Sequence, residues 1–197
     1  AAQRELAKQV KYLFIVGDIV DGVGVYPDQK KELAITDIYE QYAEAARLLS
    51  KIPKKIRMII CPGNHDAMRL SEPQPPFIED FCKVLRESLP HAIFVSNPSL
   101  VNIDESENFK GIDVLLYHGY SFDYYVAEVS SIRVDGGYDR ADLIMKFLLQ
   151  QRHLAPSYNS TLHIPDAQKD YLVIEKVPDV FASGHIHKTS VSTYRNV

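Results

Sequence analysis

Four short segments of the sequence carry side chains that can bind a divalent metal ion. In each, glycine stands beside acidic, amide or imidazole residues: Gly17-Asp18, Gly63-Asn64-His65-Asp66, His118-Gly119 and Gly184-His185-Ile186-His187. Carboxylate and amide oxygens combined with imidazole nitrogens, without a thiolate, suit hard or borderline divalent ions. Two such ions about 3.5 to 4 Å apart can hold a phosphate group and activate a water molecule at neutral pH. The residue types therefore predict a two-metal site for phosphoester hydrolysis, with Asp18 as the natural bridging carboxylate.

Each segment taken alone also fits an ordinary structural role. An aspartate after glycine is often a turn residue or a helix cap, and Asn64 fits a simple turn. His118 and His185 fit polar residues whose hydrogen bonds are satisfied within the fold. Four coincident segments with complementary ligand types are hard to produce by turn chemistry alone. The set as a whole favours a metal site.

The elements that must position these segments are short apolar strands. Residues 12–16, 56–61, 114–117 and 180–183 have this character, and each is followed by one of the four segments, directly or, for 56–61, after Pro62. Open α/β sheets bind ligands beyond the carboxyl ends of their strands. We therefore expect the four turns to converge on one crevice.

Amphipathic helices alternate with these strands, which is typical of a layered α/β domain. Helices are predicted over residues 1–11, 36–50, 77–89 and 140–151, with Thr36 as the cap of the second. Further short strands are predicted over residues 93–96, 100–103 and 189–194. Since no repeat or linker interrupts the pattern, we expect one domain over residues 1–197.

The composition and charge of the chain limit the kinds of partner that it can bind unaided. The chain has 197 residues, 46% of them hydrophobic, and a net charge of -4. Proteins that bind duplex DNA unaided usually carry a basic surplus, so metal ions or another subunit would have to supply much of the positive field. Cys61 and Cys82 lack a C-x-x-C pairing and are expected to be buried apolar residues. With neither a membrane-spanning run nor a signal peptide, the chain is expected to be soluble and cytoplasmic.

The motifs G-D-x-x-D (residues 17–21), G-N-H-D (63–66), H-G (118–119) and G-H-x-H (184–187) resemble, in chain order, those of calcineurin-like metallophosphoesterases. Three further segments narrow the resemblance: DGVGVYP (21–27), QPP (74–76) and RHLAP (152–156). Together they resemble the small subunits of archaeal family-D DNA polymerases, over nearly the whole chain.

The resemblance implies a layered calcineurin-like phosphoesterase fold, with β-sheets flanked by helices and incomplete at both ends. A D-x-H strand before Asp18, which supplies two ligands in the family, and further C-terminal strands would be missing. The chain alone is therefore expected to be nearly inactive.

The resemblance also implies a role for each site residue. Asp18 would bridge the ions, and Asn64, His118 and His185 would complete one metal site. His187 would bind the other ion. His65 would contact the scissile phosphate and assist the leaving oxygen, with Asp66 orienting it. Asp21 would have a supporting rather than a ligand role, and His153 a structural one, while His91 and His163 are expected at the surface.

The implied function is 3′–5′ proofreading exonuclease activity with two divalent ions, Mn²⁺ first and Zn²⁺ or Fe²⁺ as alternatives. The implied partners are the DNA 3′ end and the large catalytic subunit, in a heterodimer or larger assembly. Three alternatives remain: a general metallophosphatase, a catalytically silent scaffold subunit of a polymerase, and a nuclease of double-strand break repair. The QPP and RHLAP segments disfavour the last.

Overall fold

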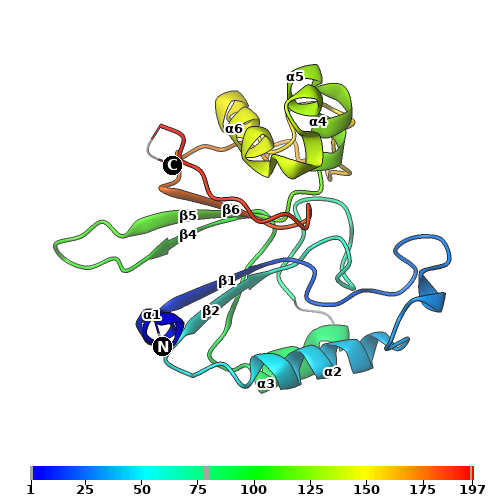
Figure 1. Cartoon of the computed structure of the whole chain (residues 1–197), viewed down its shortest axis with the longest axis vertical. Coiled ribbons are helices and arrows are strands. Elements are labelled where there is room, and N and C mark those ends of the chain that lie inside the picture. Colours follow the sequence, from blue (N-terminus) through cyan, green and yellow to red (C-terminus); the bar gives the residue numbers. More distant parts are fainter. Residues whose placement is uncertain (1, 78–79, 196) are drawn as a thin grey trace. The chain divides into compact units, whose positions relative to one another are not determined.

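A computed structural model describes residues 2–77, 80–195 and 197, and it has mixed α/β architecture (Figure 1). The chain divides into unit 1 (Ala1–Met68 and Pro75–Ser96) and unit 2 (Arg69–Gln74 and Asn97–Val197). Each unit contains one three-stranded sheet with flanking helices. The α/β class expected from the sequence is confirmed. Within the described residues, no helix combines the length and apolar character needed to cross a membrane.

Unit 1 is built on a parallel sheet in the order β1-β2-β3. Its strands are β1 (Tyr12–Val16), β2 (Arg57–Cys61) and β3 (Ile93–Phe94). Its helices are α1 (Ala2–Gln9), η1 (Gln29–Lys31), α2 (Ile38–Leu49), η2 (Asp80–Cys82) and α3 (Lys83–Ser88). The central strand β2 is buried at its last four positions, as a continuous apolar run between two parallel neighbours predicts.

Helices α2 and α3 lie side by side in unit 1 (Figure 1). Tyr42 and Ala46 of α2 pack with Ile60 of β2 and with Phe77 in the core of this unit. The rings of Tyr42 and Phe77 meet edge to face, with centroids 6.3 Å apart. Both cysteines are buried, as expected.

Unit 2 is built on a mixed sheet in the order β4-β5-β6. The middle strand pairs antiparallel with one neighbour and parallel with the other. The strands are β4 (Ser99–Ile103), β5 (Ile112–Tyr117) and β6 (Val180–Ser183). The helices are α4 (Phe122–Glu128), α5 (Ser130–Val134), η3 (Gly137–Asp139) and α6 (Ala141–Gln151).

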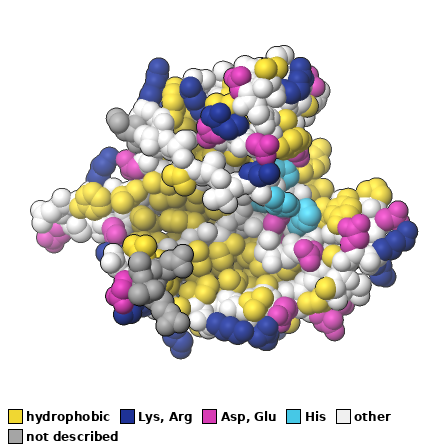
Figure 2. Space-filling model, viewed as in Figure 1, with side chains coloured by type: hydrophobic (Ala, Val, Ile, Leu, Met, Phe, Trp, Pro, Cys, Tyr) yellow, Lys and Arg dark blue, Asp and Glu magenta, His cyan; other side chains and the backbone are white. Residues whose placement is uncertain are grey.

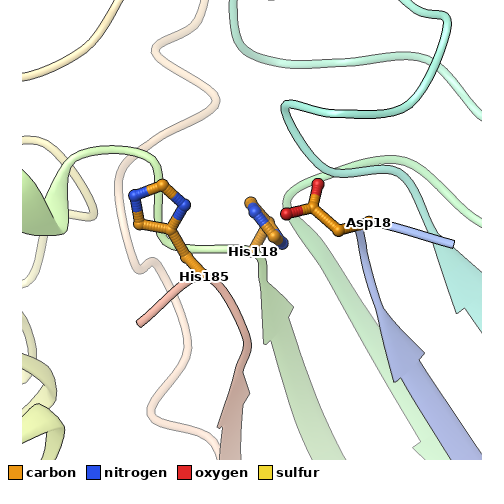
Figure 3. A group of neighbouring side chains, drawn as sticks. All are labelled: Asp18, His118 and His185. Atoms are coloured by element: carbon orange, nitrogen blue, oxygen red, sulfur yellow. The ribbon is translucent and has the colours of Figure 1, made fainter. Parts of the chain in front are cut away.

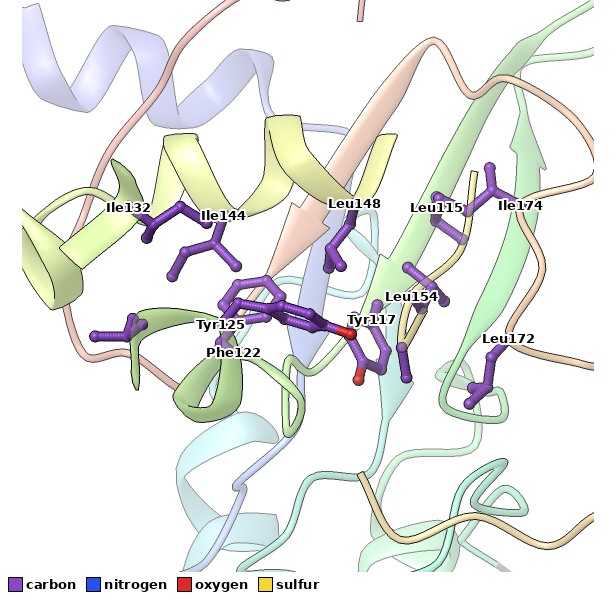
Figure 4. Packing of buried hydrophobic residues seen from close by; sticks show 12 residues of the cluster. Leu115, Tyr117, Phe122, Tyr125, Ile132, Ile144, Leu148, Leu154, Leu172 and Ile174 are labelled. Carbon is purple, nitrogen blue, oxygen red and sulfur yellow. The ribbon is translucent and has the colours of Figure 1, made fainter. Parts of the chain in front are cut away.

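Side chains from β5, α4 and α6 form the core of unit 2 (Figure 4). Tyr117 at the end of β5 meets Phe122 edge to face, with centroids 6.0 Å apart. Ile144 and Leu148 of α6 are fully buried in the same cluster. This packing fixes the carboxyl end of β5, where His118 follows.

Most predicted elements form, and the structure departs from the prediction in three places. Residues 189–194, all of them described, form no strand. The helix expected over residues 77–89 is broken into η2 and α3, and its residues 78–79 lie outside the described residues, as does residue 1 of the first helix. Helices α4 and α5 were not predicted, because they are short and neither has a side-chain cap. Tertiary packing rather than intrinsic propensity holds such helices.

The cap of α2 is Asp37, and the prediction of Thr36 was wrong. The Asp37 carboxylate accepts hydrogen bonds from the backbone N–H groups of Tyr39 at 2.8 Å and Glu40 at 3.1 Å. Its backbone is extended, as an N-cap residue requires. The helix therefore begins at Ile38, one residue later than a cap at Thr36 would place it.

We predict that Asp37→Ala lowers the free energy of unfolding by about 1 kcal/mol, because two N–H groups lose their acceptor. Thr36→Ala is the matched control and should have little effect. Urea denaturation of both variants measures the difference. Equal destabilisation by the two substitutions would contradict the assignment of the cap.

Candidate metal centre

The predicted ligand residues all follow the carboxyl ends of strands. In unit 1, Asp18 lies two residues after β1, and Asn64, His65 and Asp66 lie in the turn after β2. In unit 2, one histidine follows β5 and two follow β6: His118, His185 and His187. Each unit thus presents part of the predicted ligand set at one edge of its sheet.

Asp66 holds the two turns of unit 1 together. Its buried carboxylate accepts hydrogen bonds from the N–H groups of Asp18 at 2.9 Å, Ile19 at 3.2 Å and Gly63 at 2.8 Å. The first two donors follow β1 and the third follows β2. A buried carboxylate is stable only when such donors compensate its lost hydration. Asp66 therefore fixes where Asp18 starts its turn relative to the neighbouring strand.

Tyr42 supports Asp66 from within the core of unit 1. The Tyr42 hydroxyl lies 3.4 Å from the Asp66 carboxylate and accepts the N–H of Ala67 at 2.9 Å. Burial, and then the charge of Asp66, raise the pKa of Tyr42 well above its ordinary value. The phenol stays protonated and remains a donor at any physiological pH.

His65 is held by the β1 turn. Its backbone N–H donates to the Asp18 carboxylate at 2.9 Å, and its ring Nδ1 lies 2.8 Å from the backbone carbonyl oxygen of Asp21. Because a carbonyl oxygen only accepts hydrogen bonds, Nδ1 carries the proton. Nε2 is then the ring nitrogen available to interact with a substrate. The resemblance implied that Asp66 orients this ring. The ring instead donates to the backbone carbonyl oxygen of Asp21, a residue for which a supporting role was predicted.

Gly22 explains how the His65 turn approaches so closely. A Cβ on Gly22 would collide with the carbonyl oxygen of His65, and the residue has a φ of 75°. The Gln41 side chain closes this turn, accepting from the Gly22 N–H at 2.9 Å and donating to its carbonyl at 3.1 Å. Only glycine fits such a close backbone approach at a positive φ.

His118 and His185 come together in unit 2 (Figure 3). They follow neighbouring parallel strands, and their ring centroids are 5.2 Å apart with the planes at 73°. A nitrogen of one ring lies within 4.8 Å of a nitrogen of the other. His118 is buried, while His185 is half-buried. This spacing allows both rings to bind one cation. Figure 3 also labels Asp18, which follows β1 in unit 1.

Asp123 on α4 orients the His185 ring. Its carboxylate lies 2.9 Å from His185 Nε2, and this hydrogen bond holds the pKa of Asp123 below its ordinary value against the effect of burial. The carboxylate accepts the Nε2 proton, so Nδ1 is the nitrogen that could bind a cation. Histidine ligands of metal ions commonly donate their other nitrogen to a carboxylate in this way. The donors in unit 2 therefore fit a metal ion.

Three of the predicted ligands have left-handed backbone conformations. The φ angles are 53° at Asp18, 67° at His185 and 55° at His187. Positive φ is uncommon outside glycine, and such residues cluster where a functional site fixes the backbone. Asp28, Asp104, Arg152 and Arg195, outside the predicted set, also have positive φ, so this conformation alone does not mark the site.

The remaining histidines divide as follows. His187 is exposed in the turn after β6. His153 has both ring nitrogens in hydrogen bonds, accepting the Ala155 N–H at 2.9 Å and meeting the Asp170 carboxylate at 2.9 Å, which fits the structural role expected of it. His91 is exposed and His163 half-buried.

A buried polar network supports His118. The His118 N–H donates to the Asn97 side-chain oxygen at 2.8 Å, and the Asn97 amide donates to Gln74 at 2.7 Å. Glu72, almost fully buried, accepts from the hydroxyls of Tyr117 at 3.1 Å and Thr161 at 2.8 Å. The QPP segment thus contributes a buried structural glutamine rather than a ligand.

Burial raises the pKa of Glu72 to about 7, against the opposing hydrogen bonds from Thr161 and Tyr117. The Tyr117 hydroxyl can donate its one proton to Glu72 at 3.1 Å or to Ser121 at 3.0 Å, and Ser121 donates to the Leu154 carbonyl at 2.7 Å. Every hydroxyl in that chain then has an acceptor.

The family of the chain follows from comparison with known proteins. Residues 3–192 match the family of the DNA polymerase alpha/epsilon B subunit. The chain belongs to this family. Its relatives include the "DNA polymerase II small subunit" of Methanothermobacter thermautotrophicus, 46% identical over 195 residues, and that of Archaeoglobus fulgidus, 44% identical over 194. The same-named protein of Pyrococcus furiosus is 41% identical over 195 residues.

These alignments cover 99%, 98% and 99% of this chain but 38%, 37% and 30% of the respective archaeal relatives. The chain therefore spans less than two fifths of their length. The resemblance to archaeal polymerase small subunits is confirmed at the level of the family.

The sequence gives no sign of three residues that hold the candidate ligands in place, namely Asp123, Glu72 and Asn97. Nothing in their spacing marks them, since each acts through a partner distant in the chain. Glu72 and Asn97 each precede a proline, which signals a turn but no burial. Asp123 is the second residue of a helix that was not predicted.

We predict that Glu72→Gln flattens the pH dependence of stability. In the folded protein Glu72 keeps its proton up to about pH 7, whereas the unfolded chain loses it near its ordinary pKa of 4.5. Between these values the unfolded state binds fewer protons, so wild-type stability falls as the pH rises. Glutamine mimics the protonated acid and should remove a loss of up to about 3 kcal/mol.

Urea denaturation from pH 4.5 to pH 8 in the presence of EDTA measures this effect. The exposed Glu87→Gln is the control and should keep the wild-type slope. Parallel pH profiles for the wild type and Glu72→Gln would show that Glu72 is ionised throughout.

Proposed function

We propose that this chain is the phosphodiesterase part of a DNA polymerase small subunit and removes nucleotides from the 3′ end of a DNA strand. One observation carries the proposal: the Asp123–His185 pair in unit 2, with His118 beside it, is an arrangement suited to a metal ion. Membership of a DNA polymerase subunit family supports DNA as the substrate. Scaffold proteins have no need of a carboxylate-oriented histidine pair.

We further propose that the predicted ligand residues bind two divalent ions. Asp18 would bridge them, Asn64, His118 and His185 would complete one site, and His187 would contribute to the other. Bound ions of this kind polarise the phosphate ester and lower the pKa of a water molecule. Mn²⁺ suits the carboxylate, amide and imidazole donors, as do Zn²⁺ and Fe²⁺.

The protein's own groups do the remaining work. In its protonated form, His65 has an N–H at Nε2 that can donate to the departing sugar oxygen, because Nδ1 is already engaged by Asp21. Asp66 keeps the His65 turn next to Asp18 throughout. The backbone that carries the general acid is therefore fixed before substrate arrives.

The charge of the chain supports a partner for DNA binding. On the face drawn in Figure 2, Lys and Arg side chains lie among Asp and Glu side chains. With a net charge of -4, the chain offers little electrostatic attraction to a polyanion. We propose that the large polymerase subunit supplies most of the affinity for DNA.

A scaffold function is the second candidate, since the family name describes a polymerase subunit and not an activity. A general phosphatase is the third, because the same donors suit phosphomonoesters. The scaffold requires no metal, and the phosphatase requires no nucleic acid. Both differences can be measured.

We predict that Asp123→Asn weakens Mn²⁺ binding to the full-length protein by about 10- to 100-fold, because the carboxylate that orients a ligating histidine is lost. Asp142→Asn is the matched control, since Asp142 also lies in the first turn of a helix of unit 2 and pairs with Arg140. Electron paramagnetic resonance of free Mn²⁺ gives both affinities. Identical affinities for the two variants would show that Asp123 does not orient a metal-binding histidine.

We predict that His65→Ala lowers the rate of 3′-end degradation by about 100- to 10,000-fold, the usual contribution of a general acid. Mn²⁺ affinity should change little, because no ligand is removed. The assay follows a 5′-labelled single-stranded oligonucleotide with the full-length protein, and His91→Ala is the control. Rapid hydrolysis of a chromogenic phosphate ester with no DNA degradation would favour the phosphatase. No hydrolysis of either substrate by the Mn²⁺-bound wild type would favour the scaffold.

A further inference from the structure

A hollow in unit 2 is lined by an unusual set of rings. Its volume is about 480 Å³, within the range of small-molecule sites, and its walls include Tyr120, Tyr124, Tyr158 and His163. Asn159 adds an amide to the lining. None of the described residues that line it is Lys or Arg. A site with these walls suits a flat, uncharged aromatic group rather than a phosphate. We call it the tyrosine pocket.

The tyrosine pocket adjoins the candidate metal ligands of unit 2. Asp123, whose carboxylate holds His185, is one of its lining residues. The Tyr120 ring lies with its centroid 6.0 Å from that of His185, almost perpendicular to it at 79°. One wall of the pocket is thus the structure that orients His185. A ligand in the pocket would lie next to a phosphate held at His185.

The loop that carries Tyr158 is fixed to the core. The Ser157 N–H donates to the Tyr125 hydroxyl at 3.1 Å, which in turn donates to the Ser160 hydroxyl at 2.8 Å. The Ser160 hydroxyl donates to the Ser157 carbonyl at 2.6 Å. Thr161 is bonded to buried Glu72. The backbone on both sides of Tyr158 is therefore pre-organised.

Tyr158 itself is 83% exposed on this fixed loop, and its ring meets that of His163 edge to face at 5.6 Å. Exposing a large aromatic ring on a rigid support contributes little to folding. It does suit stacking, since an ordered ring loses little entropy when a second flat group packs on it. Single-stranded nucleic acids bind proteins largely through such base–aromatic stacking.

We propose that the tyrosine pocket binds the unpaired base at the 3′ end of a DNA strand, stacked on Tyr158, and so delivers the terminal phosphodiester to the metal centre. The inference rests on the proposed function and adds the subsite that recognises the substrate. A base inside a duplex is stacked and paired and cannot enter, whereas a frayed or single-stranded end can. The pocket would thus make the nuclease act on unpaired ends.

The test uses the full-length protein in EDTA and a single-stranded oligonucleotide with 2-aminopurine at its 3′ end, whose fluorescence falls when the base stacks. The wild type should quench the emission on binding. Tyr158→Ala should lose the quenching and bind roughly 5- to 150-fold more weakly, the loss expected for one base stack. Tyr158→Phe should behave as the wild type. Tyr171→Ala, at another exposed tyrosine of unit 2, is the control and should also be unchanged.

A second oligonucleotide with an abasic 3′ end completes the cycle. The wild type should bind it as weakly as Tyr158→Ala binds the first, and Tyr158→Ala should not distinguish the two. Absence of quenching by the wild type, or equal quenching by Tyr158→Ala, overturns the proposal. The quenching assay involves neither metal nor turnover. Quenching without any nuclease activity would therefore contradict only the proposed function. Nuclease activity without quenching would contradict only the proposed role of the tyrosine pocket.

Discussion

The site of unit 1 depends on one buried carboxylate that accepts hydrogen bonds from three backbone N–H groups. Asp66 takes two of these from the turn after β1 and one from the turn after β2, so it ties the ends of neighbouring strands at a fixed offset. These hydrogen bonds fix the backbone positions of Asp18 and His65. A further hydrogen bond, from the His65 backbone N–H to the Asp18 carboxylate, joins the two residues directly. A side chain is positioned here mainly by where its backbone is held. The backbone positions of Asp18 and His65 therefore depend on the Asp66 carboxylate.

In unit 2, the backbone that carries the candidate ligand His118 is also held by buried polar side chains, some neutral and one titratable. Asn97 accepts the His118 N–H, and Glu72 joins the strand end to the loop that carries Tyr158. Because burial raises the pKa of Glu72 to about 7, a change in its burial or hydrogen bonding would change its protonation near neutral pH. Buried polar networks of this kind specify one arrangement only when each member is satisfied. Precise placement of His118 is thus linked to the integrity of the tyrosine pocket.

The sequence predicted the parts of the fold that depend on local pattern. The strand at residues 12–16 and the helix at residues 140–151 follow from apolar periodicity, and the predicted ligands do lie at strand ends. What periodicity cannot predict is which polar side chain meets which distant backbone group. Asp66 was expected to orient the His65 ring and no role was expected for Asp123, because long-range hydrogen bonds leave no spacing signal. Helices α4 and α5 were missed since packing, and not propensity, stabilises them.

The pairing of Gln74 with Asn97 has a consequence for how the chain folds. Two backbone hydrogen bonds, of 2.7 Å and 3.0 Å, join these residues of unit 2, and the whole of residues 75–96 of unit 1 lies between them. That stretch is a loop tied at its base, whose closure costs entropy before its contacts form. Unit 1 and unit 2 are consequently interleaved along the chain. No single cleavage of the polypeptide separates them, so neither is obtained by simple truncation.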